Sequence, residues 1–198
     1  MMDDEGFDYG VLTGVGLMIA AALVLLMAFS MFRATAPANT VISLESAASQ
    51  VNGDIGTVAA MAIPYVHEST YDTSGIDLLI GHDQVIARSG CSTFSRPTVS
   101  RAYPGLYVEN DTIMWGDTAG FREYLNVSFN ATGTRNDPIR ANRSSELGSL
   151  MDRAGRSLLE KPLSITPKKP LVIEKLFIYT CSEGGMPGGE PYVFVYQR

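Results

Sequence analysis

The beginning of the chain is dominated by one uncharged apolar stretch. Residues 9–32 contain no Asp, Glu, Lys, Arg or His, and residues 11–32 are mostly Leu, Ala, Met, Val and Ile. A helix of this length is about 33 Å long, enough for a hydrocarbon core of about 30 Å. Since a core helix of a soluble protein is rarely apolar on every face, the pattern predicts a transmembrane or hydrophobic helix over residues 9–33. Residues 1–8 are then a short acidic leader or cytoplasmic tail.

A cleaved secretory signal peptide is the alternative for this stretch. Ala36-Pro37-Ala38 offers the small residues of a cleavage site. However, residues 1–10 carry four acidic residues and no Lys or Arg, whereas a signal peptide begins with basic residues. The apolar stretch also exceeds the usual ~7–15 residues. A retained anchor is therefore the main prediction.

Helical spacing resumes after the apolar stretch. Pro37 lacks a backbone N–H and is expected to break or kink the helix. Apolar residues then recur at steps of three and four until Pro64 ends the pattern. This spacing predicts an amphipathic helix over residues 34–64 that lays one apolar stripe against the following domain. The stripe comprises Leu44, Ala48, Val51, Ile55, Val58 and Ala62.

The remaining residues, 65–198, carry mainly β-strand signals. Segments 171–179 and 192–196 are rich in β-branched and aromatic residues and flank a Gly-rich segment, which predicts a hairpin. Segments 76–80 and 84–88 predict a second hairpin, with His82 exposed at its tip. Residues 92–111 are rich in Ser, Pro, Tyr and Gly and are expected to be largely irregular.

Two short helices complete the expected domain. Asp117 is expected to cap a helix that runs to about Phe129, and Ser144 is expected to cap a second helix. The predicted fold class is α+β. A long N-terminal hydrophobic helix continues, with a kink near Pro37, into an amphipathic helix packed on a mainly antiparallel β-sheet ectodomain.

Four glycosylation acceptors bear on the side of the membrane that this domain occupies. The only basic residue near the apolar stretch is Arg33, which favours a cytoplasmic domain by the positive-inside rule. Four N-x-[ST] sequons lie within residues 110–144 and favour an extracytoplasmic domain instead. Short sequons also arise by chance without carrying sugar. The acceptors are Asn110, Asn126, Asn130 and Asn142.

The cysteine count points to the same side. Cys91 and Cys181 are the only two cysteines, and an even number in an exported domain favours one disulfide. The alternative is a pair of buried free thiols. We expect the bridge, and with it a single-pass cell-membrane protein whose C-terminal domain lies outside the cytoplasm.

The start of the apolar helix resembles a known family. The segment 14–20, which reads Gly-Val-Gly-Leu-Met-Ile-Ala and follows a short acidic start, resembles the N-terminal segment of archaeal type IV pilins and pilin-like proteins. The resemblance implies a leader that a peptidase removes, here at Gly6, a hydrophobic helix that bundles into a filament core, and a variable outer domain rich in β structure. Small residues that permit close helix packing are Gly10, Gly14, Gly16 and Ala20.

The sequence offers little catalytic chemistry. The only histidines, His67 and His82, give no zinc-binding spacing with the distant cysteines, and no nucleophile elbow or phosphate-binding loop is present. With 15 basic and 21 acidic residues the formal charge is −6, and no basic cluster suits nucleic acid. We therefore expect no enzyme, no cofactor, no metal and no nucleic-acid partner.

Three functions remain open at this point. The first is a membrane-anchored, pilin-like structural or adhesive surface protein, whose partners are the lipid bilayer and copies of itself or similar subunits. The second is a monomeric anchored extracytoplasmic binding or receptor domain, for which the Tyr-rich segment 92–109 is the main motivation. The third, an exported enzyme, has no motif to support it.

Overall fold

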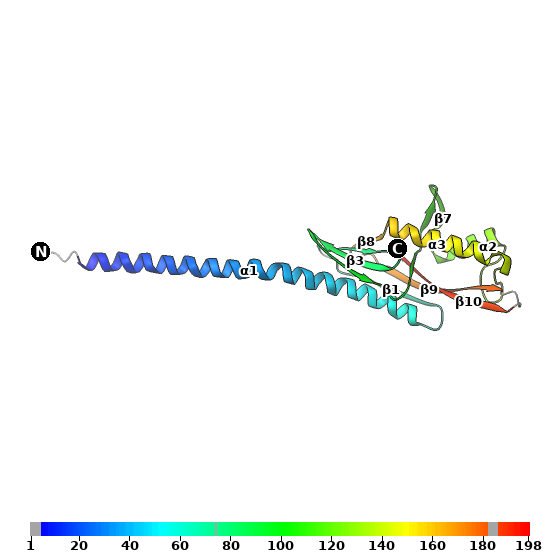
Figure 1. Ribbon diagram of the computed structural model, residues 1–198, viewed down its shortest axis with the longest axis horizontal. Helices are drawn as coiled ribbons and strands as arrows, with labels where there is room; N and C mark the ends of the chain where they lie inside the picture. Colours follow the sequence, from blue (N-terminus) through cyan, green and yellow to red (C-terminus); the bar gives the residue numbers. More distant parts are fainter. Residues whose placement is uncertain (1–4, 74, 182–185) are drawn as a thin grey trace. The chain divides into compact units, whose positions relative to one another are not determined.

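The computed structural model describes residues 5–73, 75–181 and 186–198, and within the first helix it describes the side chains of residues 16–30 and 41–60. The chain divides into two compact units, Met1–Ile42 and Ser43–Arg198. The first unit holds the whole apolar stretch, residues 9–32. The second holds the sheets and the remaining helices (Figure 1).

The hydrophobic and amphipathic segments form one continuous helix. Helix α1 runs from Glu5 to Ala60, and Pro37 does not end it. A proline inside a helix removes one backbone hydrogen bond, and the turns on either side of Pro37 keep the helical conformation. The end of α1 at Ala60 lies just before the expected stop at Pro64, so Ala62 falls outside the helix and is exposed.

The transmembrane prediction is wrong. In the part of the chain that the structure describes, no helix is long and apolar enough to cross a membrane. A helix that crosses a bilayer takes about 20 consecutive apolar residues. The single-pass topology predicted over residues 9–33 and the cell-membrane localisation are corrected accordingly.

The strands form two four-stranded sheets and one separate hairpin. Sheet A has the order β1 (Tyr65–Ser69), β9 (Leu171–Cys181), β10 (Pro187–Gln197) and β5 (Ala102–Pro104). Sheet B has the order β4 (Ser92–Pro97), β3 (Gln84–Ser89), β2 (Asp77–Ile80) and β8 (Leu163–Ile165). The hairpin pairs β6 (Tyr107–Glu109) with β7 (Thr112–Trp115). Sheet A, which was expected to be mainly antiparallel, is mixed, because β5 runs parallel to β10.

Both faces of sheet A are covered. On one face, Ile173, Val193 and Val195 pack with the stripe of α1 and with sheet B in one apolar cluster. On the other face, Leu176 and Phe194 pack with the helices α2 (Thr118–Phe129) and α3 (Ser144–Glu160) in a second cluster. Successive strand residues point to opposite faces, so burial on both sides explains the near-continuous apolar runs of β9 and β10 (Figure 1).

The stripe of α1 forms one wall of the first cluster. Leu44, Ala48, Val51, Ile55 and Val58 each have 0% of their surface exposed. The amphipathic pattern read from the sequence is confirmed at these five positions. Near the end of α1, the Asp54 carboxylate accepts a hydrogen bond from the Tyr71 hydroxyl, and the Lys175 ammonium donates to the backbone oxygens of Ala59 and Met61.

The second cluster depends on where α2 and α3 begin. The Asp117 carboxylate accepts a 2.7 Å hydrogen bond from the Gly120 amide, which confirms Asp117 as the N-cap of α2. Ser144 is the first residue of α3 rather than its cap, because a short 3-10 helix, η1 (Ala141–Arg143), leads into α3. The Ser144 hydroxyl donates instead to the Ala141 oxygen within that turn.

Candidate assembly surface

The described apolar segment of α1 is exposed all round. Every residue from 16 to 30 is exposed, and none of them carries a charge. Its only hydroxyl, on Ser30, is satisfied within the helix by a 2.8 Å hydrogen bond to the Met27 oxygen. A helix that is apolar on all sides needs cover from an apolar environment. The large exposed side chains are Leu17, Met18, Ile19, Leu23, Val24, Leu25, Leu26, Met27 and Phe29.

The small residues predicted for helix packing are only partly described. Gly16 and Ala20 are four residues apart and therefore lie on the same face of α1. A Cβ atom on Gly16 meets no described atom within 4 Å, so no contact with the described residues requires a glycine there. Gly6, Gly10 and Gly14 lie outside the residues whose side chains the structure describes, and their proposed roles stay predictions.

All four sequon asparagines are exposed. Asn110 lies at the tip of the β6–β7 hairpin, in the left-handed region with a φ of 50°. Asn126 lies on α2, Asn130 is the left-handed C-cap of α2, and Asn142 lies in η1. Exposure leaves each side-chain amide accessible to a modifying enzyme. Whether any of them carries sugar stays a prediction.

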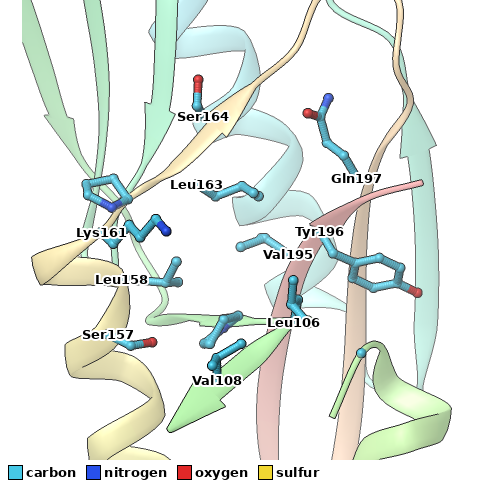
Figure 2. A pocket seen from close by; sticks show the side chains of 13 residues that line it. Leu106, Val108, Ser157, Leu158, Lys161, Leu163, Ser164, Val195, Tyr196 and Gln197 are labelled. Carbon is cyan, nitrogen blue, oxygen red and sulfur yellow. The ribbon is translucent and has the colours of Figure 1, made fainter. Parts of the chain in front are cut away.

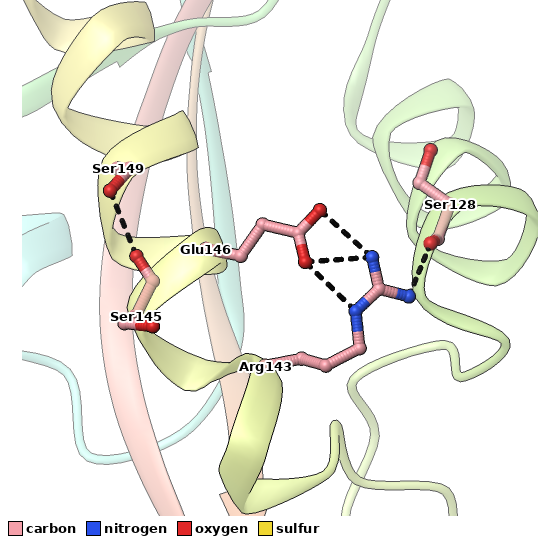
Figure 3. Close-up of polar contacts among 5 residues, drawn as sticks. All are labelled: Ser128, Arg143, Ser145, Glu146 and Ser149. Atoms are coloured by element: carbon pink, nitrogen blue, oxygen red, sulfur yellow. Dashed lines mark hydrogen bonds and ion pairs between the residues drawn. The ribbon is translucent and has the colours of Figure 1, made fainter.

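One arginine, Arg143, joins the elements that carry three of these acceptors. The Arg143 guanidinium donates to both carboxylate oxygens of Glu146, at 2.9 and 2.8 Å, and to the backbone oxygen of Ser128 at 2.6 Å (Figure 3). It also lies over the Phe129 ring, 4.6 Å from the ring centroid. These contacts join η1 and the first turn of α3 to the end of α2. Asn126, Asn130 and Asn142 therefore lie on adjoining elements, whereas Asn110 is on the separate hairpin.

The structure does not form the expected disulfide. Both cysteines are free thiols, Cys91 exposed and Cys181 half-buried. Cys91 lies in the turn between β3 and β4 of sheet B, whereas Cys181 ends β9 of sheet A. The Cys181 amide donates to the Ile139 oxygen, and Cys181 is paired in the sheet with Pro187. The two thiols are thus placed by different sheets, and sequence distance alone cannot reveal this.

The two histidines occupy separate polar contacts. His67 Nε2 lies 3.6 Å from the Asp54 carboxylate, close to the bond between Asp54 and Tyr71. His82 Nδ1 lies 2.7 Å from the Ala102 oxygen, and its ring contacts the Tyr103 ring edge-on. Among the residues with described side chains, no group of three His, Cys, Asp or Glu residues is placed to hold a metal ion.

Comparisons with known proteins identify no relative of this chain. No protein-family model matches the chain, and no curated protein or solved structure matches it either.

Proposed function

We propose that the protein is a pilin-like structural subunit, which assembles with copies of itself or with similar subunits through the apolar surface of α1. One observation carries this proposal: residues 16–30 expose large apolar side chains on every side of a helix without a single charge. The α+β domain of the second unit is carried on the resulting assembly. The resemblance of segment 14–20 to the N-terminal segment of pilin-like proteins supports the same conclusion.

In water, the free chain exposes these apolar side chains at a cost in free energy. Removing one Val, Leu, Ile, Met or Phe side chain from water stabilises by about 1.5–3 kcal/mol. Nine such side chains are between 52% and 75% exposed in this segment. Their combined burial is large enough to offset an association cost of about 4–15 kcal/mol. Side chains on all sides of one helix need more than one neighbour, so a bundle suits them better than a single helix pair.

The small residues give such a bundle a point of close approach. Gly16 and Ala20 share a face, and a Cβ on Gly16 would have open space within the chain. The missing side chain at Gly16 leaves room for the backbone of another helix to approach closely. Packed subunits with a repeated head-to-tail contact would form an open filament if the rotation between them does not close a ring.

The test is the assembly state of the full-length chain with one apolar residue of α1 replaced. Leu25 is 70% exposed and lies within the apolar segment. Leu25→Glu keeps a good helix former but places a charge on the surface that has to be buried. The matched control is Val127→Glu, since Val127 is 80% exposed on α2 in the other unit.

We expect the unmodified chain and the Val127→Glu variant to sediment as large assemblies in detergent-free buffer. Leu25→Glu is expected to shift the distribution to small species while the circular dichroism spectrum is retained. Electron microscopy of the same samples distinguishes filaments from irregular aggregates. A monomeric unmodified chain, or equal assembly of both variants, would refute the proposal.

A further inference from the structure

A cavity of about 490 Å³ lies in the α+β domain, well apart in sequence from the apolar segment of α1. It is bordered by the end of α3 and β8, by the end of β10, and by the chain that leads from β5 into β6 (Figure 2). Small-molecule sites usually measure about 300–1,000 Å³ and are mostly apolar with a few polar groups. The size of this cavity falls within that range.

The walls of the cavity are largely apolar and well held. Leu158 and Val195 form buried parts of the lining, with 4% and 1% of their surface exposed. Leu106 and Val108 are 54% and 46% exposed and form apolar parts of its rim. The chain at Gly105 lies tightly against the Tyr196 side chain, where a Cβ would clash, and the Gly105 amide donates to the Val195 oxygen at 2.9 Å.

Most polar side chains of the lining are already engaged within the protein. The Tyr196 hydroxyl donates to the Glu174 carboxylate at 3.0 Å, and the Ser157 hydroxyl donates to the Ala154 oxygen at 2.7 Å. The Gln197 side chain accepts from the Thr166 amide and donates to the backbone oxygens of Thr166 and Lys169. A sugar or another polyhydroxylated ligand needs several free hydrogen-bonding groups, so this lining does not suit one.

The side chains of Ser164 and Lys161 are the exceptions; both are exposed, and Lys161 is the charged one. It is the residue that follows α3, where its backbone amide donates to the Ser157 oxygen. Its ammonium group has no hydrogen bond or ion pair to any side chain or backbone atom in the described part of the chain. Figure 2 shows the nitrogen of Lys161 directed into the space between β8 and β10. A single unpaired cation beside an apolar cavity favours a ligand with one anionic group.

We propose that this cavity binds a small apolar carboxylate, with its hydrocarbon part between Leu106, Leu158 and Val195 and its carboxylate on Lys161. All ligands of this class consist of an unbranched or aromatic hydrocarbon that ends in one negative charge. This binding activity is independent of assembly through α1, because no residue of the cavity belongs to that helix.

The chain contains its own reporter for binding. Trp115 is the only tryptophan of the sequence, and its indole N–H donates to the Pro104 oxygen at 3.1 Å. Pro104 and Gly116, the residue after Trp115, both line the cavity. A ligand in the cavity is therefore expected to change the emission of Trp115.

The experiment titrates the full-length chain with decanoate, and with decanol and decylamine as probes of equal chain length, while Trp115 emission and binding heat are recorded. Lys161→Gln removes the cation, and Lys169→Gln is its control on the turn before β9. Val108→Phe narrows the rim, and Val127→Phe adds the same ring on α2, outside the cavity. Neither pair introduces a second tryptophan.

We expect decanoate to bind more tightly than decanol, and decylamine to bind most weakly. Lys161→Gln should weaken decanoate binding by about ten- to hundredfold, the worth of one charge-assisted hydrogen bond, and leave decanol binding unchanged. Val108→Phe should weaken the binding of both decanoate and decanol. Both control variants should bind these ligands as the unmodified chain does.

Equal affinity of Lys161→Gln and Lys169→Gln for decanoate would overturn the proposal. So would decanoate binding that is indifferent to Val108→Phe, because the ligand would then lie elsewhere, for example on the exposed surface of α1. Binding of a short peptide with an apolar C-terminal residue, without binding of decanoate, would reassign the cavity to a protein partner.

Discussion

At the scale of single residues, Tyr71 shows how a buried side chain ties α1 to the chain that follows it. Only 4% of Tyr71 is exposed, and its hydroxyl donates to the Asp54 carboxylate. Burial, followed by the nearby negative charge of Asp54, raises the pKa of Tyr71 well above its ordinary value. Tyr192 has a raised pKa for the same reasons, with Glu190 as the carboxylate.

The raised pKa of Tyr71 predicts a loss of stability at alkaline pH. In the unfolded chain a tyrosine loses its proton near pH 10, whereas folded Tyr71 keeps it. Above about pH 10 the folded state therefore binds more protons than the unfolded state, and the free energy of unfolding falls by up to about 1.4 kcal/mol per pH unit for each such tyrosine. Below about pH 10 this contribution is fully present.

Tyr71→Phe tests that contribution. The variant should lose about 1 kcal/mol at neutral pH, because Asp54 loses a hydrogen-bond donor, and its stability should fall less steeply between about pH 9 and pH 11. Urea unfolding at several pH values measures both effects. Tyr65→Phe is the control, since 37% of Tyr65 is exposed. Parallel alkaline profiles for the two variants would contradict the assignment.

At the scale of elements, the end of α1 is held by a strand far away in sequence. Lys175, on β9, is 6% exposed, and its ammonium donates to the Ala59 and Met61 oxygens where α1 ends. The last carbonyls of a helix have no partner within the helix. A cation near this end also interacts favourably with the helix dipole.

Replacing Lys175 with Met should loosen this end of α1. Methionine fills much of the same volume, but it leaves the Ala59 and Met61 oxygens without this donor. We expect a loss of about 1–3 kcal/mol in the free energy of unfolding, with faster amide exchange in the last turns of α1. Lys169→Met, at an exposed position, is the control. Unchanged exchange near Ala59 would show that the bond does not hold the helix end.

Strong local patterns predicted several elements well. The step of three and four residues found the buried stripe of α1, and the β-branched and aromatic runs found β9 and β10. Asp117 was recognisable as a cap because its carboxylate acts on an amide three residues away. The segments 76–80 and 84–88 do pair as β2 and β3. Each of these signals depends on neighbouring residues alone.

The elements that were missed depend on distant partners. The sequence of β4 is Ser-Thr-Phe-Ser-Arg-Pro, which has little β-strand propensity of its own. This segment is a strand because it pairs with β3. β5 has three residues and is positioned by parallel pairing with β10. His82 was expected at an exposed tip, but α3 covers it, and only a glycine at position 155 leaves room for its ring.

The cavity was invisible to sequence reasoning for the same reason. Its lining comes from the end of α3, from β8, from the end of β10 and from the segment after β5. Lys161 shows no special spacing in the sequence, and its significance arises because it carries the unpaired charge of a lining in which Tyr196, Ser157 and Gln197 are engaged. Cys91 and Cys181, which are free thiols, belong to different sheets, and the sequence does not show this placement either.

At the scale of the whole molecule, the division into two units places the two proposed activities in different parts of the chain. The exposed apolar segment of residues 16–30 belongs to Met1–Ile42, and the cavity belongs to Ser43–Arg198. Assembly and ligand binding can therefore be disrupted independently, by Leu25→Glu and by Lys161→Gln. A variant that removes one activity is a control for the other.

The same division makes a prediction about truncation. A chain of residues 43–198 keeps the whole stripe of α1, whereas a chain of residues 62–198 loses Leu44, Val51, Ile55 and Val58, all fully buried. Burying one such side chain contributes about 1.5–3 kcal/mol, so their joint loss is comparable to the total stability of a typical domain, about 5–15 kcal/mol.

We expect residues 43–198 to unfold in urea in one cooperative transition. Trp115 emission and circular dichroism measure this transition. Residues 62–198 should show no such transition and should aggregate, because the faces of sheets A and B that pack on α1 become exposed. If the shorter chain unfolded cooperatively at the same urea concentration, α1 would be an appendage. The expected difference would instead establish that one helix serves both units, as a wall of the domain core after Ser43 and as an apolar surface before it.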